Sequence, residues 1–75
     1  MEPKWTESKY HGIHAVTASY SIGIHQARMT YFNFDVFLWH AFIFTGSELL
    51  GWEYSLAQAQ EASVREIEAK MRREE

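Results

Sequence analysis

The alternation of apolar and polar positions predicts β-strands before residue 30. Two sets of side chains alternate here: Val16, Ala18, Tyr20, Ile22 and Ile24 on one side, and Thr17, Ser19, Ser21, Gly23 and His25 on the other. A period of two with many β-branched residues is typical of a half-buried strand. We expect one long strand, or two strands broken near Thr17–Ser19, with Gly23 as a candidate β-bulge.

The stretch from Phe32 to Phe44 is apolar on both sides when it is treated as a strand. Its even positions are Phe32, Phe34, Val36, Leu38, His40, Phe42 and Phe44. Its odd positions begin polar, at Asn33 and Asp35, and then turn apolar. We therefore assign the even side to the core and expect the odd side to be exposed. His40 would then be a buried, neutral histidine with a hydrogen-bond partner.

A turn and a short strand are predicted next. Residues 45–48 have a turn composition in which Gly46 supplies a permissive φ. Residues 49–54 would return as a strand that places Leu50, Trp52 and Tyr54 on one face.

A C-terminal helix over residues 56–73 is predicted from its start signal and its periodicity. Ser55 and Gln58 have the S-x-x-Q spacing of a capping box. The stripe at helical spacing consists of Leu56, Ala59, Ser63, Val64, Ile67 and Met71. The alternative is one longer helix from Ser47, which would carry Gly51 in its interior at a cost of about 1 kcal/mol. We favour the strand followed by the helix.

These elements predict an α+β fold, an antiparallel sheet of three to four strands with one C-terminal α-helix packed on one face. We divide the chain into a flexible N-terminal arm, residues 1–9, and a single ββ(β)βα domain, residues 10–75. Trp5 is the group of the arm that we expect to dock. A chain of this length buries only roughly 60% of its unfolded surface, so its own core is marginal.

Composition narrows the function classes. The chain has no Cys and therefore no disulfide or thiolate metal site, and its net charge of −3 argues against a general polyanion binder. Its first residues lack the apolar core of a signal peptide. No apolar run approaches the roughly 20 residues that span a bilayer. We expect a cytoplasmic protein, in the host cell if it is phage-encoded, with no membrane association.

Candidate chemistry is sparse. The possible metal ligands are His11, His14, His25 and His40. On a strand His11 and His14 would point to opposite faces, and their spacing matches no zinc motif. No residues supply a nucleophile, a base and an orienting group together. We expect neither an enzyme, nor a metal, nor a cofactor.

The aromatic excess predicts protein binding. One helix covers one sheet face, and the other would expose more than the few hundred Å² of apolar patch that monomers usually show. The predicted binding residues are Phe37, Trp39, Tyr31, Arg28 and Ile43. We expect the partner to be a protein or a second copy, as a homodimer. Within a wrapped monomer, Trp5 and Tyr10 would instead fold over this face.

Two other functions remain open. Arg28 lies near aromatic residues in the sequence, as in sheets that stack the bases of RNA or single-stranded nucleic acid. A structural phage subunit would share the chemistry of a protein-binding module.

The order of elements, with the junction "GWEYSLAQAQEA" between strand and helix, resembles the small sheet-plus-one-helix proteins of phages and mobile elements, including anti-CRISPR proteins. The resemblance implies a compact, non-catalytic protein that occupies a surface on a larger complex, such as a phage-borne inhibitor of a host defence complex. It carries no functional residue over to this chain.

Overall fold

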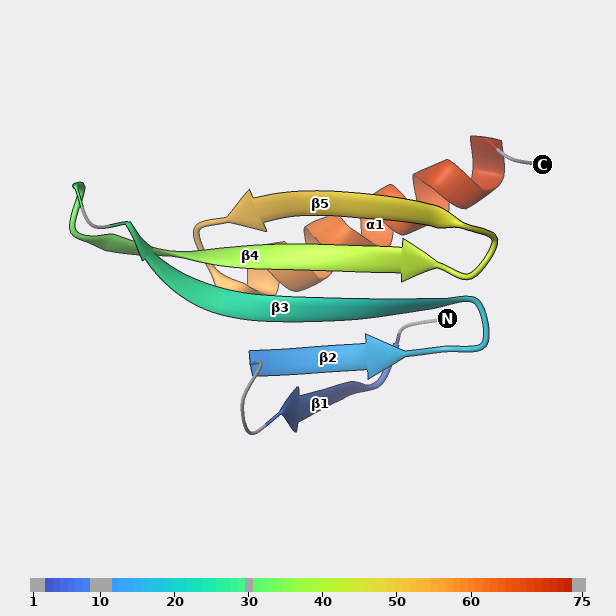
Figure 1. Cartoon of the computed structure of the whole chain (residues 1–75), viewed down its shortest axis with the longest axis horizontal. Helices are drawn as coiled ribbons and strands as arrows, with labels where there is room; N and C mark the ends of the chain where they lie inside the picture. Colours follow the sequence, from blue (N-terminus) through green and yellow to red (C-terminus); the bar gives the residue numbers. More distant parts are fainter. Residues whose placement is uncertain (1–2, 9–11, 30, 74–75) are drawn as a thin grey trace.

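The computed structural model describes residues 3–8, 12–29 and 31–73, and it shows an α+β fold (Figure 1). The elements are β1 (Trp5–Ser8), β2 (Gly12–Val16), β3 (Tyr20–Met29), β4 (Phe34–Ile43), β5 (Ser47–Glu53) and α1 (Leu56–Arg73). The sheet has five strands in the order β1-β2-β3-β4-β5, and each neighbouring pair is antiparallel. The predicted class is confirmed, but the sheet has one strand more than the three to four expected.

The additional strand is β1, which comes from residues assigned to the N-terminal arm. It pairs with β2 in a register that sets Trp5 opposite Ala15. Tyr10 and His11, which entered the sequence predictions, lie outside the described residues.

The chain between residues 12 and 29 forms two strands, which is the second of the two alternatives. The Thr17 hydroxyl oxygen accepts hydrogen bonds from the backbone N–H groups of Ser19 (3.1 Å) and Tyr20 (3.2 Å), which stabilises the turn between β2 and β3. The β3–β4 register runs without interruption through Gly23, opposite His40, so no bulge forms there.

The junction between β5 and α1 has the predicted form. The backbone N–H of Gln58 donates to the Ser55 hydroxyl (3.2 Å), and that hydroxyl donates to the Gln58 side-chain oxygen (3.1 Å). Ser55 therefore caps the first turn. Residues 47–53 form a strand, so the alternative of one long helix from Ser47 is wrong.

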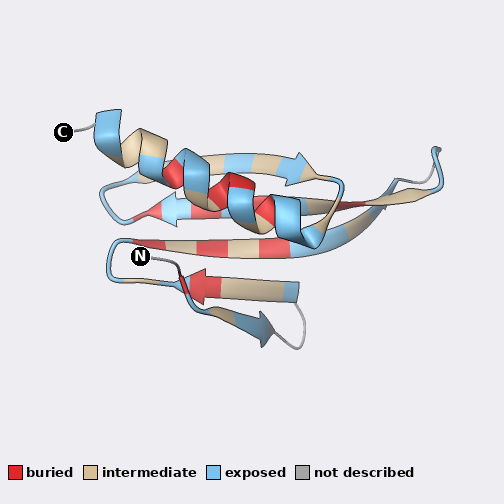
Figure 2. Ribbon diagram, turned by 180° about the vertical axis from the view of Figure 1, so that it is seen from behind, coloured by how far each residue is buried: buried red, intermediate tan, exposed pale blue. Residues whose placement is uncertain are grey.

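The core lies between α1 and one face of the sheet. α1 packs across β3, β4 and β5 and leaves β1 and β2 uncovered (Figure 2). The buried cluster consists of Tyr20, Ile22, Ile24, Trp39, Ala41, Ile43, Ala59 and Ile67. The helix contributes mainly small side chains, and the buried Ser63 hydroxyl donates to the Gln60 carbonyl (3.0 Å). Small side chains let the helix approach the sheet closely.

The predicted assignment of the two faces of β4 is wrong. Trp39 and Ile43 are 5% and 1% exposed beneath α1, whereas Leu38, His40 and Phe42 are exposed on the opposite face. The cause is the strand register. Ile24 of β3 lies opposite Trp39, and residues directly opposite each other share a face. The odd positions of β4 therefore join the apolar side of β3.

The position of the Trp39 ring accounts for the glycine at position 51 of the sheet. It lies opposite Gly51 of β5, and a Cβ added at Gly51 would lie 2.5 Å from carbon atoms of the indole ring. Position 51 therefore has no room for a side chain. Within the described part of the chain, the Trp39 indole nitrogen is buried and has no hydrogen-bond partner.

Candidate functional site: the open face of the sheet

The face of the sheet opposite α1, here called the open face, carries most of the exposed apolar side chains. Figure 1 looks onto this face, with α1 behind the sheet. Strand register and burial place on it, from β3, β4, β5 and the residues that follow them, Met29, Phe34, Leu38, His40, Phe42, Phe44, Leu50, Trp52 and Tyr54. No element covers these side chains in the described structure.

Aromatic rings form a continuous chain along one end of the open face. The ring centroids of Phe32 and Phe34 are 5.9 Å apart, and those of Phe34 and Tyr54 are 5.8 Å apart. Trp52 meets Tyr54 edge to face at 5.1 Å. Such separations are typical of favourable ring contacts. The rings therefore contact and support one another along this edge of the face.

Two adjacent hollows lie on the open face. The first, of about 170 Å³, is lined by Met29, Phe34, Val36, Leu38 and Trp52. Val36 is buried, although the register places it on the face opposite α1. The second, of about 450 Å³, is lined by His25, Leu38, Trp39, His40, Leu50, Gly51 and Trp52. Leu38 and Trp52 line both hollows. The open face is therefore concave in places as well as apolar.

Charged groups are few on the open face. The His40 imidazole lies 3.9 Å from the Glu48 carboxylate, and both side chains are exposed. Arg28, the cation of the described strands, lies on the other side of the sheet, where its guanidinium is 3.8 Å from Asp35 and hydrogen-bonds Asn33. Among the described strand residues no Lys or Arg side chain faces the open side.

The predicted binding residues do not form one surface in the structure; they lie in three separate regions. Trp39 and Ile43 lie beneath α1, and Phe37 lies partly buried on the same side. Their expected exposure is wrong, for the reason of register given above. Arg28 is exposed on the helix side, and Tyr31, at the β3–β4 turn, is 97% exposed.

Residues of the open face were assigned to the core by sequence, including Leu38, Phe42 and Phe44. Pairing β3 with β4 through the Met29–Phe34 connection would have identified the correct face, because that register sets even residues of one strand opposite odd residues of the other.

The histidines do not form a metal site in the described residues. His14, His25 and His40 lie on three neighbouring strands, and the register places all of them on the open face. In the parts of the chain that the structure describes, no three His, Cys, Asp or Glu side chains gather in a way that could hold a metal ion.

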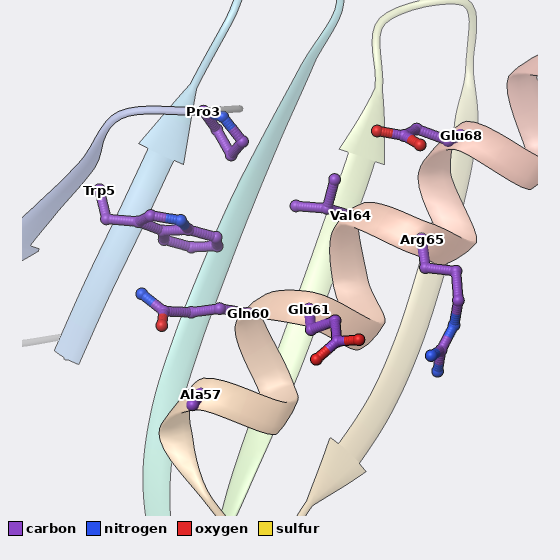
Figure 3. A pocket seen from close by; sticks show the side chains of 8 residues that line it. All are labelled: Pro3, Trp5, Ala57, Gln60, Glu61, Val64, Arg65 and Glu68. Atoms are coloured by element: carbon purple, nitrogen blue, oxygen red, sulfur yellow. The ribbon is translucent and has the colours of Figure 1, made fainter. Parts of the chain in front are cut away.

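A second concavity lies on the helix side, between β1 and α1 (Figure 3). This groove of about 720 Å³ is lined by Pro3, Trp5, Ala57, Gln60, Glu61, Val64, Arg65 and Glu68. Gln60 extends toward Trp5, whereas Arg65 extends away from it. Trp5 packs against the core here, so it does dock, but on the helix side and not over the open face. The lining offers no hydroxyl or thiol nucleophile.

Tyr20 of β3 lies in the core beneath α1 and interacts with Glu68 of that helix. Burial raises the pKa of its phenol above the usual value, and the negative charge of Glu68 adds to the shift. The phenol therefore stays neutral in the folded protein and packs as a core side chain.

Comparison with protein-family models, curated proteins and solved structures finds no match for this chain. Over the described residues, no helix has the length and apolar character needed to cross a membrane. The functional argument therefore rests on the geometry of the open face.

Proposed function

We propose that this protein is a non-catalytic protein-binding module whose open face binds a second copy of the same chain. The observation that carries the proposal is the continuous apolar surface over β4 and β5, which no element of the described chain covers. The sequence predicted a binding surface on the side of β4 that carries Trp39 and Ile43, whereas the uncovered surface lies on the side that carries Leu38 and Phe42.

The size of this surface supports a stable interface. Aromatic side chains carry roughly 150–250 Å² each, and the exposed fractions of Phe32, Trp52 and Tyr54 are 70%, 52% and 62%. With Leu50, at 76%, and the other side chains of the face, the apolar area exceeds the few hundred Å² usual for a monomer. It approaches the roughly 800 Å² that each partner contributes to a standard interface.

The charge distribution favours a second copy as the partner. In a two-fold interface the same patch meets itself, so a face with unpaired charges would repel its own copy. The open face holds one carboxylate on its described strands, Glu48, and that group lies beside His40. A nucleic-acid partner is less favoured, because binding to phosphate depends on Lys and Arg. The described strands place neither on this face.

The expected role as a phage-borne inhibitor of a host defence complex stays a prediction. It is supported by the layout of one small sheet and one helix, which resembles phage proteins of that kind. A self-associated module of this shape would act by occupying a surface on the larger complex.

Sedimentation equilibrium tests the proposal. The wild-type protein should show about twice the chain mass of 8.8 kDa at micromolar concentration. Trp52→Ser removes a central aromatic anchor from both copies and should weaken self-association at least thirtyfold, since each such anchor contributes roughly 2 kcal/mol or more. Tyr31→Ser is the matched control: it removes a more exposed aromatic side chain outside the strands and should leave the mass unchanged. A wild-type monomer at every accessible concentration would contradict the proposal.

A further inference from the structure

Gly23 is the glycine for which neither backbone conformation nor packing within the chain requires a residue without a side chain. Gly12 and Gly46 have φ values of +79° and +117°, which favour glycine, and Gly51 lies under the Trp39 ring. A Cβ added at Gly23 would meet nothing within 4 Å. Glycine inside a strand is unfavourable relative to Ala, and it often marks a place where another molecule approaches the backbone closely.

The register places Gly23 in the middle of the open face. His14, Gly23, His40 and Leu50 form one row across β2, β3, β4 and β5. Because Gly23 has no side chain, the row has a notch between His14 and His40. Leu50, on the other side of His40, is 76% exposed and is the most exposed apolar side chain of the described strands. The row therefore contains a hole and a knob on opposite sides of β4.

We infer that Leu50 of each copy inserts into the notch over Gly23 of the other copy, around a two-fold axis that runs along β4. The inference rests on the proposed self-association and specifies its geometry. Neighbouring strands are about 4.8 Å apart, so Gly23 and Leu50 lie at equal distances on either side of β4. A two-fold axis that lies midway between the two sheets, parallel to β4, places β3 of one copy over β5 of the other. It therefore sets Leu50 above Gly23 twice in one interface.

The arrangement matches what packed sheets require. Sheets packed face to face lie about 10 Å apart and fill that space by interdigitating side chains. A leucine needs a position without a side chain opposite it, which Gly23 supplies. Rotation of the two sheets relative to each other by the usual angle of about 30° separates Leu50 and Gly23 only slightly, because both residues lie one strand away from His40, the centre of that rotation. His40 of each copy would face its equivalent at the axis.

A double-mutant cycle on the full chain tests the pairing. Gly23→Leu fills the notch, and it should weaken self-association at least tenfold while the monomer stays folded, because a Cβ at position 23 meets nothing within 4 Å. Leu50→Ala removes the knob and should also weaken self-association. The double variant Gly23→Leu, Leu50→Ala should associate more tightly than Gly23→Leu alone, since the side chain introduced at position 23 then faces a shortened residue at position 50. Dissociation constants come from sedimentation equilibrium, and folding is checked by circular dichroism.

The control is Ser21→Leu, which adds the same side chain on the same face of β3, two residues from the notch and opposite Phe42. Its effect should simply add to that of Leu50→Ala. Unchanged or tighter association of Gly23→Leu would overturn the inference, as would additivity in the main cycle. In both cases dissociation by Trp52→Ser would leave the proposed function standing, whereas a monomeric wild type would remove both. If Gly23→Leu fails to fold, Gly23→Ala carries the same test.

Discussion

The two faces of the sheet differ in how their apolar residues are used. The face beneath α1 combines large residues, among them Tyr20, Ile24 and Trp39, with small ones such as Ala41, Gly51 and, from the helix, Ala59. The open face carries most of the exposed aromatic side chains, and no element of the described chain covers them. The number of apolar residues therefore does not identify the core face of a small sheet. The core is the face whose small residues allow a helix to approach.

The largest expected effect separates the two faces at neighbouring positions of β4. Trp39→Ala should lower the free energy of unfolding by about 3–5 kcal/mol, because it leaves a cavity beneath α1. Leu38→Ala should cost clearly less, because that side chain is 43% exposed on the open face. Urea denaturation measures both losses, at protein concentrations low enough to keep the chain monomeric. A larger loss for Leu38→Ala would show that the faces are assigned the wrong way round.

Two glycines give the next comparison. Gly51→Ala should destabilise the monomer by about 1–3 kcal/mol, the usual cost of overpacking, because its methyl group would collide with the Trp39 ring. Gly23→Ala should leave the monomer unchanged or stabilise it by up to about 1 kcal/mol, because glycine is unfavourable inside a strand. Thermal denaturation of the two variants side by side provides the test. Equal losses would mean that the open face is as closely packed as the covered one.

The cap of α1 tests what keeps the covered face covered. Ser55→Ala removes the hydroxyl that accepts from the Gln58 backbone, and it should cost about 0.5–2 kcal/mol. Ser55→Asp, which retains a capping oxygen, should restore most of the stability. An unchanged denaturation midpoint for Ser55→Ala would show that the cap contributes nothing to helix docking.

The smallest expected effect concerns pH. The pKa of Tyr20 is raised by burial and then by Glu68, so its neutral form is favoured in the folded state. The contribution of the neutral phenol to the free energy of unfolding is fully present below the unfolded-state pKa of about 10. It is lost as the pH rises through the higher pKa of the folded state. Tyr20→Phe should therefore reduce the loss of stability above about pH 10. Denaturation midpoints of both proteins between neutral and alkaline pH would show it, and parallel profiles would contradict it.

Local signals predicted the elements that depend on few residues. The capping spacing of Ser55 and Gln58 gave the start of α1, and the alternation around Trp52 gave β5. β1 was not predicted, because its four residues, from Trp5 to Ser8, carry no clear alternation. Its strand conformation comes from pairing with β2, which is information about tertiary structure.

The candidate site could not be predicted, because it depends on pairing between strands. Treated alone, β4 has an apolar side at Leu38 and Phe42 and another at Trp39 and Ile43. Only the register with β3 decides which of them faces α1, and a shift of one residue would exchange them. Protein binding was therefore predicted from composition, while the exposed apolar residues of β4 were assigned to the wrong face.

The order of the strands has a consequence for the rate of folding. Every strand pairs with its neighbour in sequence, and α1 returns onto the last three strands. Proteins with mostly local contacts close short loops and fold faster than sheets with distant pairings. The longest ladder, between β3 and β4, joins strands linked by a short connection. The monomer can therefore complete its fold, with the open face already formed, without contacts from any other molecule.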